Sequence, residues 1–141
     1  FDVEGKGFDP TVGKIRREGT SEDAGQELTV RSCLLSALLC CNTTLGKVRD
    51  PETGEEKWEP KGNSSEAPIV VAARKVGFSE DICKEYPRAL EIPFSSSRKM
   101  MLTVTDVSGR SELCSSGMSL PAGTKYLAVC KGAPNFIIEY C

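Results

Sequence analysis

The hydrophobic pattern of this chain changes its period part-way along, and this change constrains the fold most. From Gln26 to Asn42, apolar residues recur three and four positions apart, as on the buried face of a helix. After Pro87, apolar and polar residues alternate as they do in strands. The alternation predicts strands over Leu90–Pro93, Met100–Thr105 and Lys125–Lys131. Helical and strand segments do not alternate regularly, so an antiparallel sheet is favoured over a parallel, doubly wound one.

Shorter elements complete the predicted fold. Glycine and proline residues delimit extended segments at Phe1–Val3 and Lys14–Arg17. Gly46–Gly62, rich in charge, glycine and proline, is expected to be an irregular or hairpin insertion. Short helices are predicted at Glu80–Tyr86 and Asn135–Tyr140. The fold class predicted is α+β, a twisted antiparallel β-sheet flanked by helices.

A further helix is predicted to open at Ser64-Ser65-Glu66-Ala67-Pro68 and to run to about Val76. A serine can cap its first turn, and an acidic side chain there suits the helix dipole. Pro68 is tolerated where backbone amides have no helical partner. Gly77 is expected to end this helix.

Length and charge narrow the class of protein. The 141 residues fit a single domain, 1–141, and the abrupt ends suggest an excised fragment of a longer chain. A net charge of −2 supplies no broad basic field, so no nucleic-acid partner is expected. No segment approaches the roughly 20 apolar residues that span a bilayer, so direct membrane contact is not expected either. The isolated chain is expected to be a monomer.

The chemistry available to the chain is limited by its lack of histidine. A Ser-His or Cys-His nucleophile pair is excluded, and no metal site or catalytic residue is predicted. The seven cysteines are an odd number without a C-x-x-C pair, and we expect free thiols.

Two separated motifs are candidates for ligand binding. In the first, Phe94 precedes a serine run that ends in Arg98 and Lys99. An exposed phenylalanine can stack on a base and a lysine can meet a phosphate. Alternatively the motif is a turn, with Phe94 in the core and solvated cations. The second motif is the tetrapeptide Lys131-Gly132-Ala133-Pro134, in which Gly132 would let a ligand ring approach the backbone. Alternatively it is only the entry to a helix with a charged residue at its rim.

Taken together and in order, these segments resemble the nucleotide-binding (N) domain of P-type cation-transporting ATPases, over nearly the whole chain. The matching segments, each with its family pattern, are Cys41-Asn42 (cysteine-asparagine), Gly62–Ala67 (G-[DEN]-P-[ST]-E-x-A), Phe94–Met101 (F-[DS]-S-x-R-K-x-M) and Lys131–Pro134 (K-G-A-P). The resemblance leans toward the P2-type branch that pumps calcium or sodium. It implies an N-domain fold that continues past Cys141, so that this chain would be C-terminally truncated.

The resemblance also implies roles for individual residues. Phe94 would stack on adenine, and Glu66 would accept a hydrogen bond from its exocyclic amine. Lys131 and Gly132 would line the pocket, and Lys99 would approach the nucleotide as a cation. The remaining nucleotide-binding residues expected are Ser65, Arg98 and Ala133.

In the parent pump, a hydrolase and ion translocase, the domain would present the γ-phosphate of ATP to an aspartate of a separate domain, with Mg²⁺ accompanying the nucleotide. The implied partners are ATP and the phosphorylation and actuator domains of the same chain. The fragment would be a cytoplasmic, ATP-binding part of an integral membrane protein, not catalytic by itself.

Three departures from the family pattern are relevant. Ser64 replaces a proline, Pro68 follows Ala67, and Ser96 stands where several relatives carry a phosphate-contacting arginine. They leave open an N domain that has lost affinity for ATP. A different alternative is a non-catalytic protein-interaction domain with fortuitous motif matches.

Overall fold

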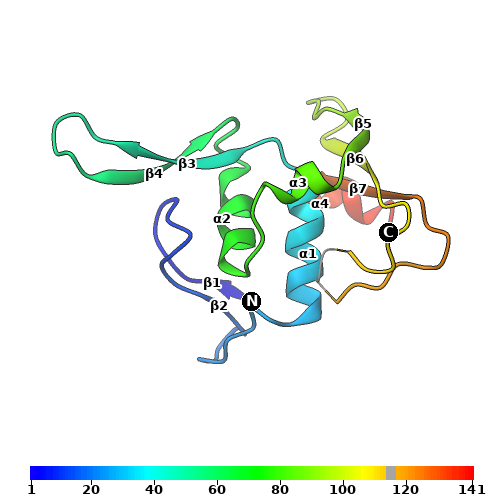
Figure 1. Cartoon of the computed structure of the whole chain (residues 1–141), viewed down its shortest axis with the longest axis horizontal. Coiled ribbons are helices and arrows are strands. Elements are labelled where there is room, and N and C mark those ends of the chain that lie inside the picture. Colours follow the sequence, from blue (N-terminus) through cyan, green and yellow to red (C-terminus); the bar gives the residue numbers. More distant parts are fainter. Residues whose placement is uncertain (114–116) are drawn as a thin grey trace.

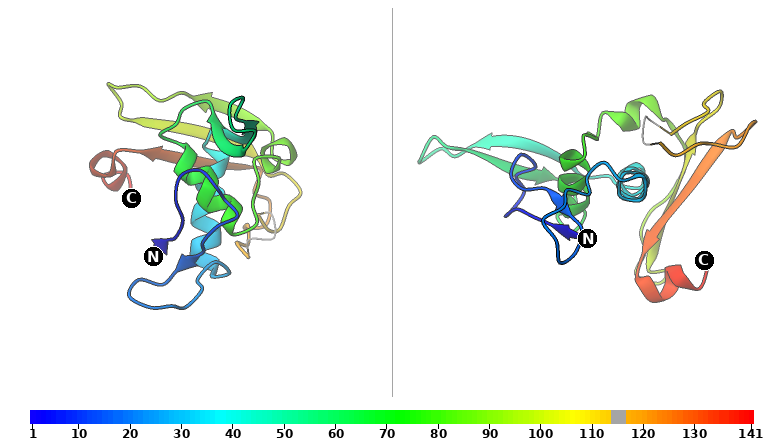
Figure 2. Two further views of the ribbon diagram at one scale, coloured as in Figure 1. Left: turned by 90° about the vertical axis from the view of Figure 1, so that its left-hand side faces the viewer. Right: turned by 90° about the horizontal axis from the view of Figure 1, so that it is seen from below.

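One central helix organises the computed structural model, which describes residues 1–113 and 117–141. Helix α1 (Leu28–Leu39) lies between helix α2 (Ala67–Lys75) and a three-stranded sheet (Figures 1 and 2). Leu35, Leu38 and Leu39 of α1 are almost completely buried. Because α1 packs against a neighbour on two sides, its apolar residues are not confined to one narrow stripe. The helix predicted within Gln26–Asn42 is confirmed, and it is shorter than predicted at both ends.

The three-stranded sheet follows the predicted alternation. Strands β5 (Arg88–Ile92), β6 (Met100–Asp106) and β7 (Tyr126–Gly132) pair antiparallel in the order β5-β6-β7. Every second residue of β6 is buried, and the hydroxyl of Thr103 on that face donates to the Leu39 carbonyl at the end of α1. Met100 lies opposite Gly132, so the start of β6 adjoins the end of β7.

Two hairpins and two short helices complete the structure. Strands β1 (Asp2–Val3) and β2 (Ile15–Arg16) form one antiparallel pair, and β3 (Thr44–Arg49) and β4 (Glu56–Lys61) form another. The β3–β4 hairpin projects away from the helices (Figure 1). The short helices are α3 (Ile82–Glu85) and α4 (Pro134–Ile138). The α+β class and the antiparallel pairing are confirmed, and the pairing is distributed over three small sheets.

The start of α2 differs from the expectation of a serine cap. The cap position is occupied by Glu66, and this side chain makes no capping hydrogen bond. The backbone amide of Ser65 instead donates to Asn63 Oδ1 at 3.0 Å, within the preceding turn. Pro68 does lie in the first turn of the helix. The Glu66 carboxylate is thereby available for contacts with other parts of the chain.

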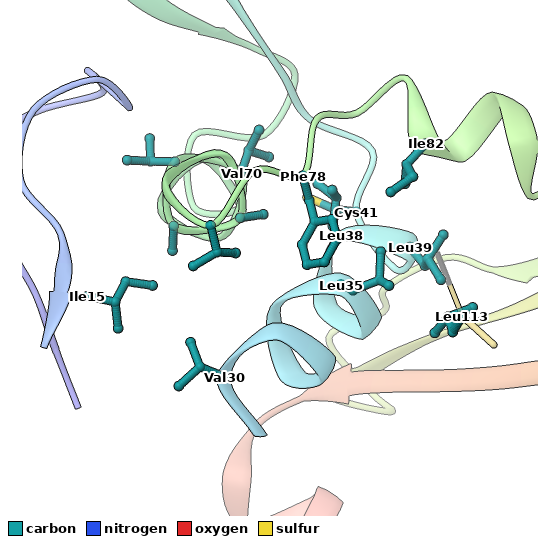
Figure 3. Close-up of a cluster of buried hydrophobic side chains, with 14 of the residues drawn as sticks. Ile15, Val30, Leu35, Leu38, Leu39, Cys41, Val70, Phe78, Ile82 and Leu113 are labelled. Carbon is teal, nitrogen blue, oxygen red and sulfur yellow. The ribbon is translucent and has the colours of Figure 1, made fainter. Parts of the chain in front are cut away.

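The core lies mainly between α1 and α2. Figure 3 shows Leu35 and Leu38 of α1 near Val70 of α2, with Phe78 and Ile82 from the segment after α2. Small buried residues on α2, such as Ala67 and Ala73, allow the two helices to pack closely. The six described cysteines are all free thiols, and Cys114 lies outside the described residues. In the described part of the chain, no helix has the length and apolar composition required to cross a membrane.

The burial of α1 predicts a large difference between two leucines of the same helix. Leu35→Ala empties a fully buried site and is expected to lower the free energy of unfolding by about 2–5 kcal/mol. Leu28→Ala, at a residue 53% exposed, is expected to change it by less than about 0.5 kcal/mol. Urea denaturation of both variants measures the difference, and equal effects would contradict the packing described for α1.

Candidate functional site

A pocket of about 450 Å³ lies where α2 begins, β7 ends and the turn after β5 passes. Its walls combine polar groups, an ion pair and two large apolar side chains. The lining residues are Asn63, Ser65, Glu66, Ile69, Phe94, Lys131 and Gly132. Residues from three distant parts of the sequence therefore meet at one place.

An ion pair between Glu66 and Lys131 forms one side of this pocket. The Lys131 ammonium donates to Glu66 Oε1 at 2.5 Å, and the two side chains are only 21% and 13% exposed. Glu66 projects from the cap position of α2 and Lys131 lies next to the last residue of β7. The pair thus joins the helix to the sheet across 65 positions of sequence.

The second carboxylate oxygen of Glu66 binds the segment that connects α1 to β3. Oε2 accepts hydrogen bonds from the Asn42 amide at 3.0 Å, the Thr43 hydroxyl at 3.1 Å and the Cys41 thiol at 3.3 Å. Burial raises the pKa of the Cys41 thiol to about 11, so this group remains a donor near neutral pH. Glu66 consequently holds three chain segments in one arrangement.

These contacts determine the charge state of Glu66. Burial by itself raises the pKa of this carboxyl group, but the hydrogen bonds from Lys131, the Asn42 amide and the Cys41 thiol outweigh burial and lower the pKa to about 2. The carboxylate is therefore ionised throughout the physiological range. It offers an ordered negative group to a ligand in the pocket.

Phe94 provides the apolar side of the pocket and is 55% exposed. It follows β5, which ends at Ile92, and precedes a turn that leads into β6. The alternative that places Phe94 in the core is wrong. An aromatic side chain this exposed beside a charged pair has an open ring face available for a flat ligand.

Gly132 lines the pocket and also touches the strand beside it. A Cβ atom at this position would lie 2.8 Å from Met100 Cα and closer still to the Lys99 carbonyl oxygen. Such distances are too short for ordinary contacts, so only glycine fits without moving β6 from β7. From the sequence, Gly132 was expected to let a ligand ring approach the backbone. In the structure, the absence of a side chain at Gly132 lets the backbone of Lys99 and Met100 approach.

The structure does not place Arg98, Lys99 or Ala133 on the pocket wall. The Arg98 guanidinium donates to the Pro93 carbonyl at 2.6 Å. Lys99 has a positive φ of 57°, and its carbonyl accepts a hydrogen bond from the Ala133 amide at 2.9 Å. Arg98 and Lys99 therefore belong to the turn between β5 and β6, and Ala133 to the junction between β7 and α4.

Two pocket residues were not assigned a role from the sequence. Asn63 lies within the Gly62–Ala67 motif, in which only Ser65 and Glu66 were assigned a role. Ile69 is three positions after Glu66 on the same helix, so it faces the same way. The helical spacing could have identified Ile69. Across 1–113 and 117–141, no three acidic or cysteine side chains gather as metal ligands.

Comparison with known proteins identifies the family. The family model for the P-type ATPase cytoplasmic domain N matches residues 29–141, which is most of the chain and includes the whole pocket. The chain belongs to this family. The resemblance found in the sequence motifs is thereby confirmed.

Individual relatives agree with this assignment. The N domain is 39% identical over 127 residues to P-type sodium-transporting ATPase4 of Toxoplasma gondii, covering 79% of this chain and 9% of that protein. It is 30% identical over 139 residues to the sodium/potassium-transporting ATPase subunit alpha-B of Artemia franciscana, covering 95% and 12%. A calcium-transporting ATPase of Bacillus subtilis is 28% identical over 97% of this chain and 13% of its own length. The chain spans about a tenth of the length of the relatives that it matches.

The lowered pKa of Glu66 predicts how stability depends on pH. A carboxyl group whose pKa falls from its ordinary value near 4.5 to about 2 stabilises the folded state above pH 4.5, and this contribution is lost as the pH falls toward 2. Glu66→Gln is expected to lower the free energy of unfolding by about 1–3 kcal/mol at pH 7, and by progressively less as the pH falls. Urea unfolding at pH 7, 5, 4 and 3 gives both profiles.

Glu56→Gln is the control for this experiment, because Glu56 pairs with Lys47 while 61% exposed. It is expected to change stability by less than about 0.5 kcal/mol at every pH. Coinciding pH profiles for Glu66→Gln and the unsubstituted chain would show that the Glu66 contacts do not stabilise the fold.

Gly132 supports a second prediction, on the steric limit at the end of β7. Gly132→Ala is expected to destabilise the domain by about 1–3 kcal/mol, because its Cβ would meet backbone atoms of the paired strand. Gly46→Ala is the matched control in another strand, since its Cβ would meet only side-chain atoms of Lys61. Thermal unfolding of the two variants tests the difference, and an unaffected Gly132→Ala chain would refute the close approach.

Proposed function

We propose that this N domain binds ATP through the pocket beside Phe94 and presents the γ-phosphate to an aspartate in a separate domain of a P-type cation-transporting ATPase. The observation that carries the proposal is a half-exposed phenylalanine and a partly buried Glu66–Lys131 ion pair in one 450 Å³ pocket. That volume lies within the range of about 300–1,000 Å³ common for small-molecule sites.

Adenine is the part of ATP that suits this pocket. The Phe94 ring would stack on the base, with Ile69 as a second apolar contact. Glu66 Oε2 accepts hydrogen bonds from the Asn42 amide and the Cys41 thiol, and it shares the Thr43 hydroxyl with the Asn63 carbonyl, whereas Oε1 accepts one hydrogen bond, from Lys131, among the described contacts. A carboxylate oxygen has two acceptor positions, so Oε1 retains one for the exocyclic amine of adenine.

The remaining groups would orient the rest of the nucleotide. Ser65 and Gly132 would form the wall around the base, with Ala133 following Gly132 at the start of α4. Lys131 supplies positive charge inside the pocket and Lys99 supplies it at the exposed border. Because most contacts are to the base end, affinity is expected to be modest and the γ-phosphate to remain accessible.

The reaction itself would require the other domains of the pump. Mg²⁺ would arrive with the phosphates and offset their charge during transfer to the aspartate of the phosphorylation domain. This chain would contribute binding and orientation, as part of the cytoplasmic portion of a membrane-embedded ion translocase. Relatives named as sodium- and calcium-transporting ATPases favour Na⁺ or Ca²⁺ as the cation.

The stacking role of Phe94 gives a direct test. Phe94→Ala is expected to weaken ATP binding by about 1–3 kcal/mol, which is roughly 5- to 150-fold in Kd, while Phe94→Tyr retains most of it. Binding is measured by amide chemical-shift titration with Mg-ATP. In the unsubstituted chain, the shifts should cluster at Ser65, Glu66, Phe94 and Lys131.

Tyr126→Ala serves as the control, because Tyr126 is equally exposed at 56% but begins β7, at the opposite end from the pocket. It should leave the Kd for ATP unchanged. Absence of shifts around the pocket at millimolar ATP would reject the proposed function. It would then favour an N domain without measurable affinity or one that binds a protein partner.

A further inference from the structure

The turn between β5 and β6 is closed by Arg98. Its guanidinium donates to the Pro93 carbonyl at 2.6 Å, five positions back. The Arg98 amide donates to the Ser95 hydroxyl at 3.2 Å, and the Lys99 amide donates to the Ser95 carbonyl at 2.8 Å. Phe94, whose side chain is half exposed, lies within the segment that the Arg98–Pro93 bond closes, directly before Ser95.

The far end of the same turn is held against the sheet. Lys99 adopts a left-handed φ of 57°, which a non-glycine residue does not readily adopt. This conformation is held in place by the hydrogen bond from the Ala133 amide to the Lys99 carbonyl and by the close backbone contact with Gly132. With the end at Lys99 fixed, the position of Phe94 depends on how the turn closes at Pro93.

We propose that Arg98 is a positioning residue, which fixes Phe94 for stacking by closing the turn onto Pro93, rather than a phosphate-binding cation. This inference rests on the proposed ATP-binding function. The only hydrogen bond described for the guanidinium points back into the turn, and Arg98 is not among the residues that line the pocket. A preordered ring loses less conformational entropy on binding, so ordering by Arg98 increases affinity for the base itself.

Ligands with and without phosphates separate the two roles. Arg98→Met removes the guanidinium and keeps an unbranched side chain. It is expected to weaken ATP and adenosine equally, by about three- to tenfold in Kd, at both 50 and 300 mM NaCl. Lys99→Met, at the neighbouring cation, is expected to weaken ATP more than adenosine and mainly at low salt. Loss confined to ATP in Arg98→Met would overturn the proposal.

Arg49→Met is a closely matched control. Arg49 Nε donates to the Gly54 carbonyl at 3.0 Å, also five positions away, in the β3–β4 hairpin outside the pocket. The substitution removes the same charge and the same kind of hydrogen bond. It should leave the Kd for both ligands unchanged, and a loss comparable to that of Arg98→Met would overturn the specific role of Arg98.

Coupling to Phe94 distinguishes positioning from general stabilisation. In a Phe94→Ala chain, Arg98→Met is expected to cause no further change in Kd, since the ring that it orders is gone. Additive losses would refute the proposal.

Amide hydrogen exchange tests the ordering of the turn in the absence of nucleotide. The Lys99 amide should exchange about five- to tenfold faster in Arg98→Met than in the unsubstituted chain, and unchanged exchange would also refute the proposal. If the unsubstituted chain failed to bind ATP, the proposed function would fall. Exchange would then still decide whether Arg98 orders the turn.

Discussion

The carboxylate of Glu66 is the interaction on which the arrangement of the pocket depends. Its two oxygens bind the end of β7 and the connection between α1 and β3, while its backbone begins α2. A neutral side chain in its place would destabilise this arrangement, because the partly buried Lys131 would lose its ion-pair partner. The carboxylate that joins these segments thus also lines the pocket.

The pocket combines a rigid side with an exposed one. Glu66 and Lys131 are attached to elements that pack around α1, in which Leu35, Leu38 and Leu39 are almost completely buried. Phe94, in contrast, lies on a turn and contacts solvent over half of its surface. A ligand that stacks on Phe94 would cover an aromatic ring already exposed, without opening the core. The cost of binding is therefore confined to the turn and the ordering of its side chains.

Most elements could be predicted from the sequence because their periods are local properties. The strands β6 and β7 and the helix α1 follow directly from apolar spacing, and the family motifs brought Glu66, Phe94 and Lys131 together as candidates. The partners of Glu66 could not be predicted in this way, because a carboxylate at the start of a helix fits the local dipole equally well. Its actual contacts are 23–25 and 65 positions away. The backbone role of Gly132 was likewise hidden, since it depends on the register of β6 against β7.

The projecting β3–β4 hairpin has a consequence for how this family can vary. The hydrogen bonds of its tip, such as those from the amides of Asp50 to Glu55 and of Gly54 to Asp50, join residues of the hairpin itself. Since the tip is not a structural partner of α1 or of the pocket, added or deleted residues there would lengthen or shorten an arm without disturbing either. The tip of this hairpin is accordingly a place where the length of the chain can change and where a tag or probe can be inserted without disturbing the core.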